Sequence, residues 1–446
     1  MKLGKEVLRL AVPSILANIT VPLVGMVDIA IAGHLGGDVP GASLIGGIAI
    51  GTMLFDLLYW NFAFLRIGTG GLTAQACGRK DGSEGGILLR ALRLAVISGL
   101  VLIAVQYLVV QGAFLFVKCS PEVRSLASEY FYIRIWAAPA TLSLFALKGW
   151  FIGMQDTVRP MIADLLVNGL NMAVSALLSF GIPGLFEGLG FKGVAIGTVV
   201  AQWSGLLYCL LALRHRYSRC FHKGMAPAAG PGFFSMNLDL FLRALGMIAV
   251  YIGFTVISAR YGDTLLAVST ILMKLLMFFS YFTDGFAYAG EALTGRYLGA
   301  GSRDGVLSAI RSSFAWSWAV AALFLLGYGL GGRWLFSLMT SDPSVLQAGE
   351  AFIPWLLLMP LAGCPAFVWD GIFAGATASA DLRNSTLLCA LGFFGLWFAG
   401  LRFLPEGADT GAIHLLMAAY FLHLLIRGLY LTIRFFPIFV NEKLTI

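Results

Sequence analysis

Residues 27–36 read VDIAIAGHLG and end an apolar run that begins soon after Arg9. About 20 consecutive apolar residues span a lipid bilayer as a helix, so this run predicts a membrane span with Asp28 inside it. The whole chain has the same character, because 59% of its 446 residues are hydrophobic and only 12% are charged. Soluble proteins carry about twice that charged fraction. The sequence therefore predicts a polytopic helical membrane protein.

Hydropathy predicts twelve such spans, six on either side of a polar interruption at residues 214–232. We therefore expect an all-α membrane protein made of two pseudo-symmetric six-helix bundles. These are an N-terminal lobe at 1–213 and a C-terminal lobe at 238–446, joined by a cytoplasmic linker at 214–237. The predicted spans are 9–33, 43–66, 89–113, 127–150, 160–181, 192–213, 238–259, 264–291, 310–335, 350–374, 383–403 and 411–435.

The distribution of basic residues predicts how the chain is oriented. If both termini are cytoplasmic, 20 Lys and Arg fall on inner loops and span ends and 7 on the outer side, as the positive-inside rule requires. The net charge of +7 then reflects the inner loops and indicates no nucleic-acid partner. We expect a multi-pass protein of the plasma (inner) membrane. The outer residues are Lys118, Arg124, Arg134, Lys192, Arg260, Arg333 and Arg402.

The two halves also resemble each other in sequence. Residues 71–93, after the second span, match residues 291–313, after the eighth, in a Thr near the span end and a Gly-containing basic turn. Residues 147–160 likewise match residues 369–384. Because both groups contain six spans, they begin on the same side of the membrane. The pseudo-twofold axis then runs along the membrane normal, and two bundles around it leave a cleft between them.

A charged residue within a span is costly and is therefore a candidate functional residue. Asp28 lies about two turns from the outer end of the first span, on a small polar stripe at helical spacing. Such a stripe faces protein or water, and the alternative role for Asp28 is a structural hydrogen bond to a neighbouring helix. Pro13 and Pro22 remove backbone hydrogen bonds from this span and can bend it. The stripe consists of Ser14, Asn18, Val21, Gly25, Asp28 and Ala32.

The eighth span carries the richest polar face of the chain. Tyr281, Asp284 and Tyr288 share this face at helical spacing, and tyrosine rings beside a carboxylate make a suitable surface for an organic cation. Lys274 lies on the same face, about 15 Å along the axis from Asp284, so the two cannot pair directly. Glu291 lies at the inner end of the span, where it is either a gate residue or an interfacial charge.

Further charges occur in the second, fourth, fifth and tenth spans. Asp56 of the second span is a candidate cleft residue. The repeat places Lys148 opposite Asp370, so the two form either a gate pair between the bundles or separate structural pairs within them. Asp164 follows Pro160 in the first turn of the fifth span, where a carboxylate stabilises a helix N-terminus.

The fifth span continues with polar residues at intervals of three and four. Asn168, Asn171 and Ser175 share one face with Asp164. Asn168 and Asn171 lie deeper in the span than Asp164. We therefore expect these two asparagines to line a polar site with Asp28.

Sequence signatures of enzymes and metal sites are absent. No GxGxxG after a strand, P-loop or HExxH occurs, the five histidines do not cluster, and the six cysteines form no CxxC, so no cofactor is expected. Transport by this chain alone must therefore draw on an ion gradient.

A receptor or channel would not need protonatable groups linked to movement. A flippase for a lipid-linked precursor would need a cleft rich in Arg and Lys. The acids in the spans outnumber the bases: Asp28, Asp56, Asp164, Asp284, Glu291 and Asp370 against Arg66, Lys148 and Lys274.

Four motifs together resemble the multidrug and toxic compound extrusion (MATE) family, in its DinF-like branch. They are VDIAIAGHLG after an AVPSI start, GWFIGMQDTVRP at 149–160, DGFAYAGEALTGRYLGAG at 284–301 and DGIFAGATASADLRNS at 370–385. The resemblance runs over essentially the whole chain. It implies two six-helix lobes around a central cleft and the efflux of organic, often cationic, compounds in exchange for H⁺ or Na⁺.

The resemblance also implies site residues. The first-span acid that is central to cation coupling in the family corresponds to Asp28, and the fifth-span Asn that accompanies it corresponds to Asn171. Family members often carry an Asp four residues later, where this chain has Ser175. Asp284 and Asp370 match acids typical of the DinF-like branch. Without the second carboxylate, we expect a proton rather than a sodium ion to be the coupling ion.

These observations predict a secondary multidrug efflux antiporter that works by alternating access as a monomer. Asp28 binds a proton from outside, the first helix repacks, and an organic cation is released outward. The alternatives are a Na⁺-coupled exporter or an organic-acid exporter of the same fold, or a lipid-linked precursor flippase.

Overall fold

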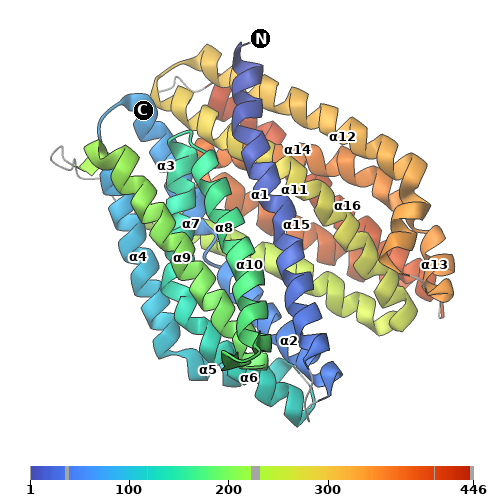
Figure 1. Cartoon of the computed structure of the whole chain (residues 1–446). Helices are drawn as coiled ribbons and strands as arrows, with labels where there is room; N and C mark the ends of the chain where they lie inside the picture. Colours follow the sequence, from blue (N-terminus) through green and yellow to red (C-terminus); the bar gives the residue numbers. More distant parts are fainter. Residues whose placement is uncertain are drawn as a thin grey trace. The chain divides into compact units, whose positions relative to one another are not determined.

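The computed structural model describes residues 2–35, 40–117, 119–221, 232–340, 342–405 and 407–441. Within these residues, twelve helical segments are long and apolar enough to cross a membrane, so the predicted twelve spans and all-α fold class are confirmed (Figure 1). Residues 222–231 of the predicted linker and the predicted outer residue Lys118 lie outside the described residues. A two-stranded antiparallel hairpin, β1 (Gly181–Ile182) and β2 (Phe186–Glu187), joins two of the helices.

The helices of both halves follow one another with short connections (Figure 1). In the first half they are α1 (Lys2–His34), α2 (Gly41–Trp60), α3 (Phe64–Arg79), α4 (Glu84–Ala104), α5 (Gln106–Phe116), α6 (Pro121–Arg134), α7 (Ala138–Gly153), α8 (Val158–Phe180) and α9 (Phe191–Tyr217). In the second half they are α10 (Gly232–Ser258), α11 (Asp263–Gly299), α12 (Arg303–Met339), α13 (Pro343–Glu350), α14 (Ile353–Gly375), α15 (Ser379–Gly400) and α16 (Asp409–Phe435). Short 3₁₀ or π segments are η1 (Ile135–Ala137), η2 (Ser218–Phe221), η3 (Ala259–Tyr261), η4 (Leu401–Phe403) and η5 (Phe436–Asn441).

Two of the predicted spans are interrupted helices with identifiable causes. The fourth span consists of α6, η1 and α7, and Pro139 stands in the first turn of α7, where its missing N–H is tolerated. The second span breaks between α2 and α3, where the side chain of Asn61 donates a hydrogen bond to the Leu57 carbonyl over 2.6 Å. Such side-chain bonds compete with the helical backbone pattern.

Backbone contacts divide the chain into two compact units. Unit 1 contains Met1–Ile15, Ala74–Lys80 and Pro231–Ile446, and unit 2 contains Leu16–Thr73 and Asp81–Gly230. In unit 2, α8 packs along α9 and α4 along α7. In unit 1, α11 packs against α12 and α14, and α15 packs along α16.

Each unit has its own apolar core and an apolar exterior. In unit 2, the buried Trp150 packs with Phe151 and Leu147, and its indole N–H donates to the Glu84 carbonyl over 2.8 Å. Large apolar side chains also point outward, such as Leu115, 79% exposed, and Leu330, 90% exposed. Water would disfavour such an exterior, whereas lipid solvates it.

The backbone shows that the two halves are structural repeats. Gln155 follows α7 with φ of 59°, and Thr377 follows α14 with φ of 55°. Residues other than Gly rarely adopt this left-handed conformation, so its recurrence at matching positions marks a shared turn. Lys80 after α3 and Gly301 after α11 form a second such pair, with φ of 57° and 66°.

Close helix contacts repeat as well. In unit 2, a Cβ on Gly149 would collide with the carbonyl oxygen of Arg66, and in unit 1 a Cβ on Gly371 would collide with that of Ala287. Glycine allows helix backbones to approach this closely. The two units therefore use the same glycine contact between corresponding helices.

Candidate functional site

Asp28 of α1 is buried within unit 2. The residue is only 6% exposed, and its Oδ1 atom has no hydrogen-bond partner among the described residues. The residues of the predicted stripe on α1 differ in burial: Ser14 and Ala32 are buried, whereas Val21 and Gly25 are exposed. A buried carboxylate oxygen without a donor lowers the stability of the folded protein. This cost is expected of a functional residue rather than of a structural one.

Arg134 supplies the positive charge near Asp28. It ends α6, and its guanidinium interacts electrostatically with both Asp28 and Asp56. Nη1 donates a hydrogen bond to the Tyr130 hydroxyl over 3.0 Å. The guanidinium carbon also lies 4.7 Å from the ring centroid of Phe55, within cation–π range. Two carboxylates on α1 and α2 therefore share one guanidinium on α6.

Arg134 was predicted to lie on the outer side, and it lies within a continuous helical segment. η1 joins α6 to α7 without a loop, so the residue stays inside the helical segment Pro121–Gly153. The predicted span 127–150 already contained this position. Counting Arg134 with the loops hid a basic residue that interacts electrostatically with Asp28.

The polar residues of α8 tie that helix to its neighbours. Asn168 donates to the Thr20 hydroxyl of α1 over 2.7 Å, which is the contact that links α8 to the helix of Asp28. Asn171 donates to the Thr198 hydroxyl of α9 over 2.8 Å. Buried Oδ1 of Asn171 has no hydrogen-bond partner within the described residues.

Ser175 continues this contact one turn further along α8. Its hydroxyl donates to the Val194 carbonyl of α9 over 3.2 Å, and the same carbonyl accepts from Thr198. Thr198 is a residue that the sequence reasoning missed, since a lone Thr in an apolar span carries no distinctive signal. The roles of Asn168, Asn171 and Ser175 in ion coupling stay predictions.

Lys148 forms an ion pair with Asp164 in unit 2. This pair agrees with the alternative that Lys148 is a structural partner within its own bundle, and the gate pair with Asp370 stays a prediction. Asp164 is not in the first turn of α8, so its predicted role at the N-terminus of that helix is wrong. The pair follows from the turn between α7 and α8. Lys148 and Asp164 are equally distant in sequence from Asp156 in that turn, and antiparallel helices bring such positions to the same level.

Asp370 of α14 is held between two arginines in unit 1. Nη2 of Arg243 from α10 lies 2.6 Å from Oδ2, and Nε of Arg427 from α16 donates to Oδ1 over 3.0 Å. Arg427 is 3% exposed and also interacts electrostatically with Asp284 of α11. Four helices thus contribute to one charged centre. The sequence had indicated its two acids, Asp284 and Asp370, but not its two arginines.

The charge balance within the spans differs from the predicted one. Arg134, Arg243 and Arg427 lie inside helical segments long and apolar enough to span the membrane, as do the acids Asp239 and Asp381, and the count from the sequence included none of them. The reason is that these arginines stand near the predicted span ends, where sequence alone assigns basic residues to loops.

On α11, the residues of the predicted face differ in their exposure. Tyr281, Asp284 and Tyr288 are all half-buried, whereas Lys274 is exposed. Glu291 is 0% exposed, so the alternative that it is an interfacial charge is wrong.

The family of the chain follows from comparison with known proteins. The MatE family model matches residues 13–177 and 240–394, which together make up most of the chain and include both repeats. The chain belongs to the MatE family. Members of this family are transporters and not enzymes, so the chain is a multidrug or toxic compound efflux transporter in the membrane that handles small organic substrates.

Relatives of this MatE transporter include characterised and solved members. It is 35% identical to the DNA damage-inducible protein F of Escherichia coli over 395 residues, which cover 87% of this chain and 84% of the relative. It is 24% identical to the probable multidrug resistance protein NorM of Thermotoga maritima, over 78% of this chain and 75% of the relative. The structure of the Vibrio cholerae MATE transporter VcmN in the bent form matches with a TM-score of 0.83 at 17% identity, covering 99% of this chain and 98% of that one.

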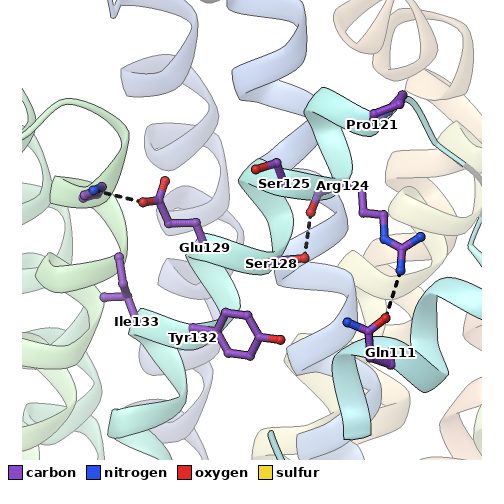
Figure 2. Close-up of a pocket in the computed structure, with 9 residues that line it drawn as sticks. Gln111, Pro121, Arg124, Ser125, Ser128, Glu129, Tyr132 and Ile133 are labelled. Carbon is purple, nitrogen blue, oxygen red and sulfur yellow. Dashed lines mark hydrogen bonds and ion pairs between the residues drawn. The ribbon is translucent and has the colours of Figure 1, made fainter. Parts of the chain in front are cut away.

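A surface pocket of the MatE chain lies apart from the predicted site residues. It has a volume of about 710 Å³ in unit 2, and two ion or hydrogen-bond contacts cross it (Figure 2). Lys192 lies 3.0 Å from Glu129, and Arg124 donates to Gln111 over 3.0 Å. The lining residues are Gln111, Pro121, Arg124, Ser125, Ser128, Glu129, Tyr132, Ile133 and Lys192.

Proposed function

We propose that this MatE transporter is a proton-coupled antiporter of the inner membrane that exports organic, mainly cationic and amphipathic, compounds by alternating access. The single observation that carries the proposal is the buried Oδ1 of Asp28, which has no hydrogen-bond donor among the described residues and lies in the field of Arg134. We assign coupling to Asp28 and a cytoplasmic location to both termini.

The proton acts by changing the charge balance around Arg134. When Asp28 is ionised, two carboxylates compete for one guanidinium. A proton that arrives from outside and binds Oδ1 of Asp28 removes one of these attractions and leaves Arg134 to Asp56. Because a ligand shifts an equilibrium only through its different affinity for the two states, this loss of attraction is the energy that repacks α1. Pro22 lies in the same helix, and its missing N–H makes repacking easier.

A proton fits this site better than a sodium ion. Position 175 is a serine, and its hydroxyl already donates to the Val194 carbonyl. Asn171 donates through Nδ2 to Thr198, which leaves its Oδ1 as one further oxygen for a cation. A sodium ion would need several oxygen ligands around one carboxylate, whereas a proton needs only Oδ1 of Asp28. Sodium coupling stays the alternative for this site.

The α11 face is the proposed substrate surface. Tyr281, Asp284 and Tyr288 are half-buried along one side of the helix, and aromatic rings beside a carboxylate attract an organic cation. Asp370 is a weaker candidate for direct cation binding, because two arginines already neutralise it. Lys274 stays a candidate for contact with an acidic group of the substrate.

A second candidate function is the export of organic acids, or the flipping of a lipid-linked precursor. The observation that favours it is the presence of two buried arginines, Arg243 and Arg427, in unit 1. Arginine recognises carboxylate and phosphate groups through paired N–H donors.

Counterflow in proteoliposomes separates these functions. The purified protein is reconstituted, a pH or Na⁺ gradient is imposed, and uptake of a panel of cationic, zwitterionic and anionic compounds is measured. The proposal expects cations to accumulate with a pH gradient and not with a Na⁺ gradient alone. Accumulation of anions only, or with Na⁺ only, would overturn it in favour of one of the alternatives.

A further inference from the structure

The surface pocket of about 710 Å³ in unit 2 lies where three helices meet (Figure 2). α6 supplies most of its lining, α5 contributes Gln111, and α9 contributes Lys192 from its first turn. Pro121, the first residue of α6, also begins the helical segment Pro121–Gly153 that is long and apolar enough to span a membrane. The pocket therefore lies at one end of a span, and we call it the α6 pocket.

α6 divides its side chains between the pocket and the interior of the bundle. Glu122 accepts a hydrogen bond from the Ser43 hydroxyl of α2 over 2.9 Å, and a Cβ on Gly51 of α2 would collide with the ring of Tyr130. Neither Glu122 nor Tyr130 lines the pocket, whereas Arg124 does. The acidic residue at the start of α6 thus serves the contact with α2.

The α6 pocket carries one more positive charge than negative charge. Nζ of Lys192 lies 3.0 Å from Oε1 of Glu129, so these two charges balance each other. The guanidinium of Arg124 instead contacts neutral groups in the described part of the chain. Its Nη2 donates to Oε1 of Gln111 over 3.0 Å, and its carbon lies 5.0 Å from the ring centroid of Phe114. Arg124 therefore supplies the surplus charge of the pocket.

The lining leaves room between its charged groups for a polar ligand. Arg124 extends toward Gln111, whereas Glu129 extends to the opposite side of the pocket (Figure 2). Ser125 and Tyr132 lie between these two sides on α6 and carry hydroxyls. Hydroxyls donate hydrogen bonds to anionic oxygens as well as accept them. The floor of the pocket thus suits an oxygen-rich anionic group next to Arg124.

Beyond its charged end, the α6 pocket continues into an apolar surface. On α5, Leu108 and Leu115 share a helical face with Gln111 at spacings of three and four residues, and they are 69% and 79% exposed. On α6, Ile133 lines the pocket about 14 Å further along the helix than Arg124. A charged end followed by an exposed apolar surface matches a molecule with an ionic headgroup and a hydrocarbon chain.

We propose that the α6 pocket binds an anionic phospholipid of the surrounding membrane. The phosphate lies at Arg124, whose N–H groups pair with phosphate oxygens, and an acyl chain follows the exposed face of α5. The single negative charge of a phosphodiester balances the surplus charge of the pocket, whereas the ammonium group of a zwitterionic lipid would restore that surplus. The site shares no residue with the Asp28 site, so it is independent of the proposed proton coupling.

Native mass spectrometry of the purified full-length protein tests this site without measuring transport. The protein is released from neutral detergent in the presence of phosphatidylglycerol, phosphatidylethanolamine or soluble glycerol phosphate, each titrated over the same concentrations. We expect one phosphatidylglycerol to bind about tenfold more tightly than phosphatidylethanolamine, and glycerol phosphate to leave no adduct. Equal affinities for the two lipids overturn the proposal. Binding of glycerol phosphate as tight as that of phosphatidylglycerol overturns the assignment to a lipid.

Single-charge variants localise the binding. Arg124→Gln should weaken phosphatidylglycerol binding by about tenfold, while Arg402→Gln, an exposed arginine of unit 1, should leave it unchanged. Equal weakening by these two substitutions would indicate a general attraction of anionic lipid to the protein and overturns the site. Glu129→Gln removes the negative charge of the pocket and should tighten phosphatidylglycerol binding, because one repulsion is lost. Weaker binding by Glu129→Gln contradicts the charge balance on which the assignment rests.

Discussion

Nε of Arg427 on α16 donates a hydrogen bond to Oδ1 of Asp370 on α14 over 3.0 Å, inside a unit that spans the membrane. Arg243 reaches the other carboxylate oxygen from α10. Asp370 is thus the point where three helices of unit 1 are joined by charge. Removing one partner of a buried ion pair leaves an uncompensated charge, which costs more than the pair itself contributes.

Replacement of Arg427 should therefore destabilise unit 1. We expect Arg427→Met to lower the free energy of unfolding by about 2–4 kcal/mol, seen as a lower melting temperature of the purified protein. Arg333→Met is the matched control, because its ion pair with Glu350 is largely exposed and exposed pairs contribute about 0–1 kcal/mol. Equal effects of the two substitutions would show that burial of the Asp370 centre is not important for stability.

Arg134 should be needed for coupling although it is not one of the proposed substrate-binding residues. We expect Arg134→Gln to slow pH-gradient-driven efflux by about tenfold, equivalent to about 1.4 kcal/mol, because protonation of Asp28 would no longer change an attraction. Arg260→Gln, an exposed arginine in unit 1, serves as the control. Unchanged efflux by Arg134→Gln would remove Arg134 from the account.

The glycine contact between α11 and α14 should tolerate no side chain. A Cβ on Gly371 would collide with the Ala287 carbonyl, so we expect Gly371→Ala to cost about 1–3 kcal/mol of stability. Gly327 of α12 has open space around its Cβ position, and Gly327→Ala should be neutral or stabilising by up to about 1 kcal/mol. Melting temperatures of the two variants check this contrast, and a reversed order contradicts the packing described for Gly371.

Asp342 makes the start of α13 sensitive to acid. Hydrogen bonds from the Ser344 hydroxyl and backbone N–H hold the pKa of Asp342 below its usual value of 3.8. A carboxylate whose pKa is lowered by folding stabilises the folded helix end at a pH above the pKa of the unfolded state. This stabilisation is lost as the pH falls through the lowered pKa of the folded state. The protection factors of the α13 amides, which compare the observed exchange with the intrinsic rate at the same pH, should therefore fall in acid. Asp342→Ala should show fast exchange already at neutral pH, and slow exchange in that variant would show that the cap is dispensable.

Hydropathy and periodicity predicted the features that depend on local sequence. The twelve spans follow from apolar runs, and the repeat follows from matched turns, such as those at Gln155 and Thr377. The location of Asp28 on a buried part of α1 also followed from helical spacing. These features need no knowledge of which helices are neighbours.

Partners across helices could not be predicted in this way. Arg243 and Arg427 reach Asp370 from α10 and α16, and that choice depends on how each helix is rotated in its bundle. Lys148 and Asp164 are the exception. A short turn joins their antiparallel helices, so residues at equal distances from the turn lie at the same height along the two helices.

Proton-gradient-driven efflux by Asp28→Asn tests the central claim most directly. The variant and the wild type are reconstituted into proteoliposomes, a pH gradient is imposed, and efflux of a cationic substrate is followed. Asp304→Asn, an exposed aspartate in the first turn of α12, is the control for the same chemical change. We predict that Asp28→Asn binds substrate but shows no gradient-driven efflux, while Asp304→Asn matches the wild type. Undiminished gradient-driven efflux by Asp28→Asn would contradict the assignment of Asp28 as the coupling carboxylate.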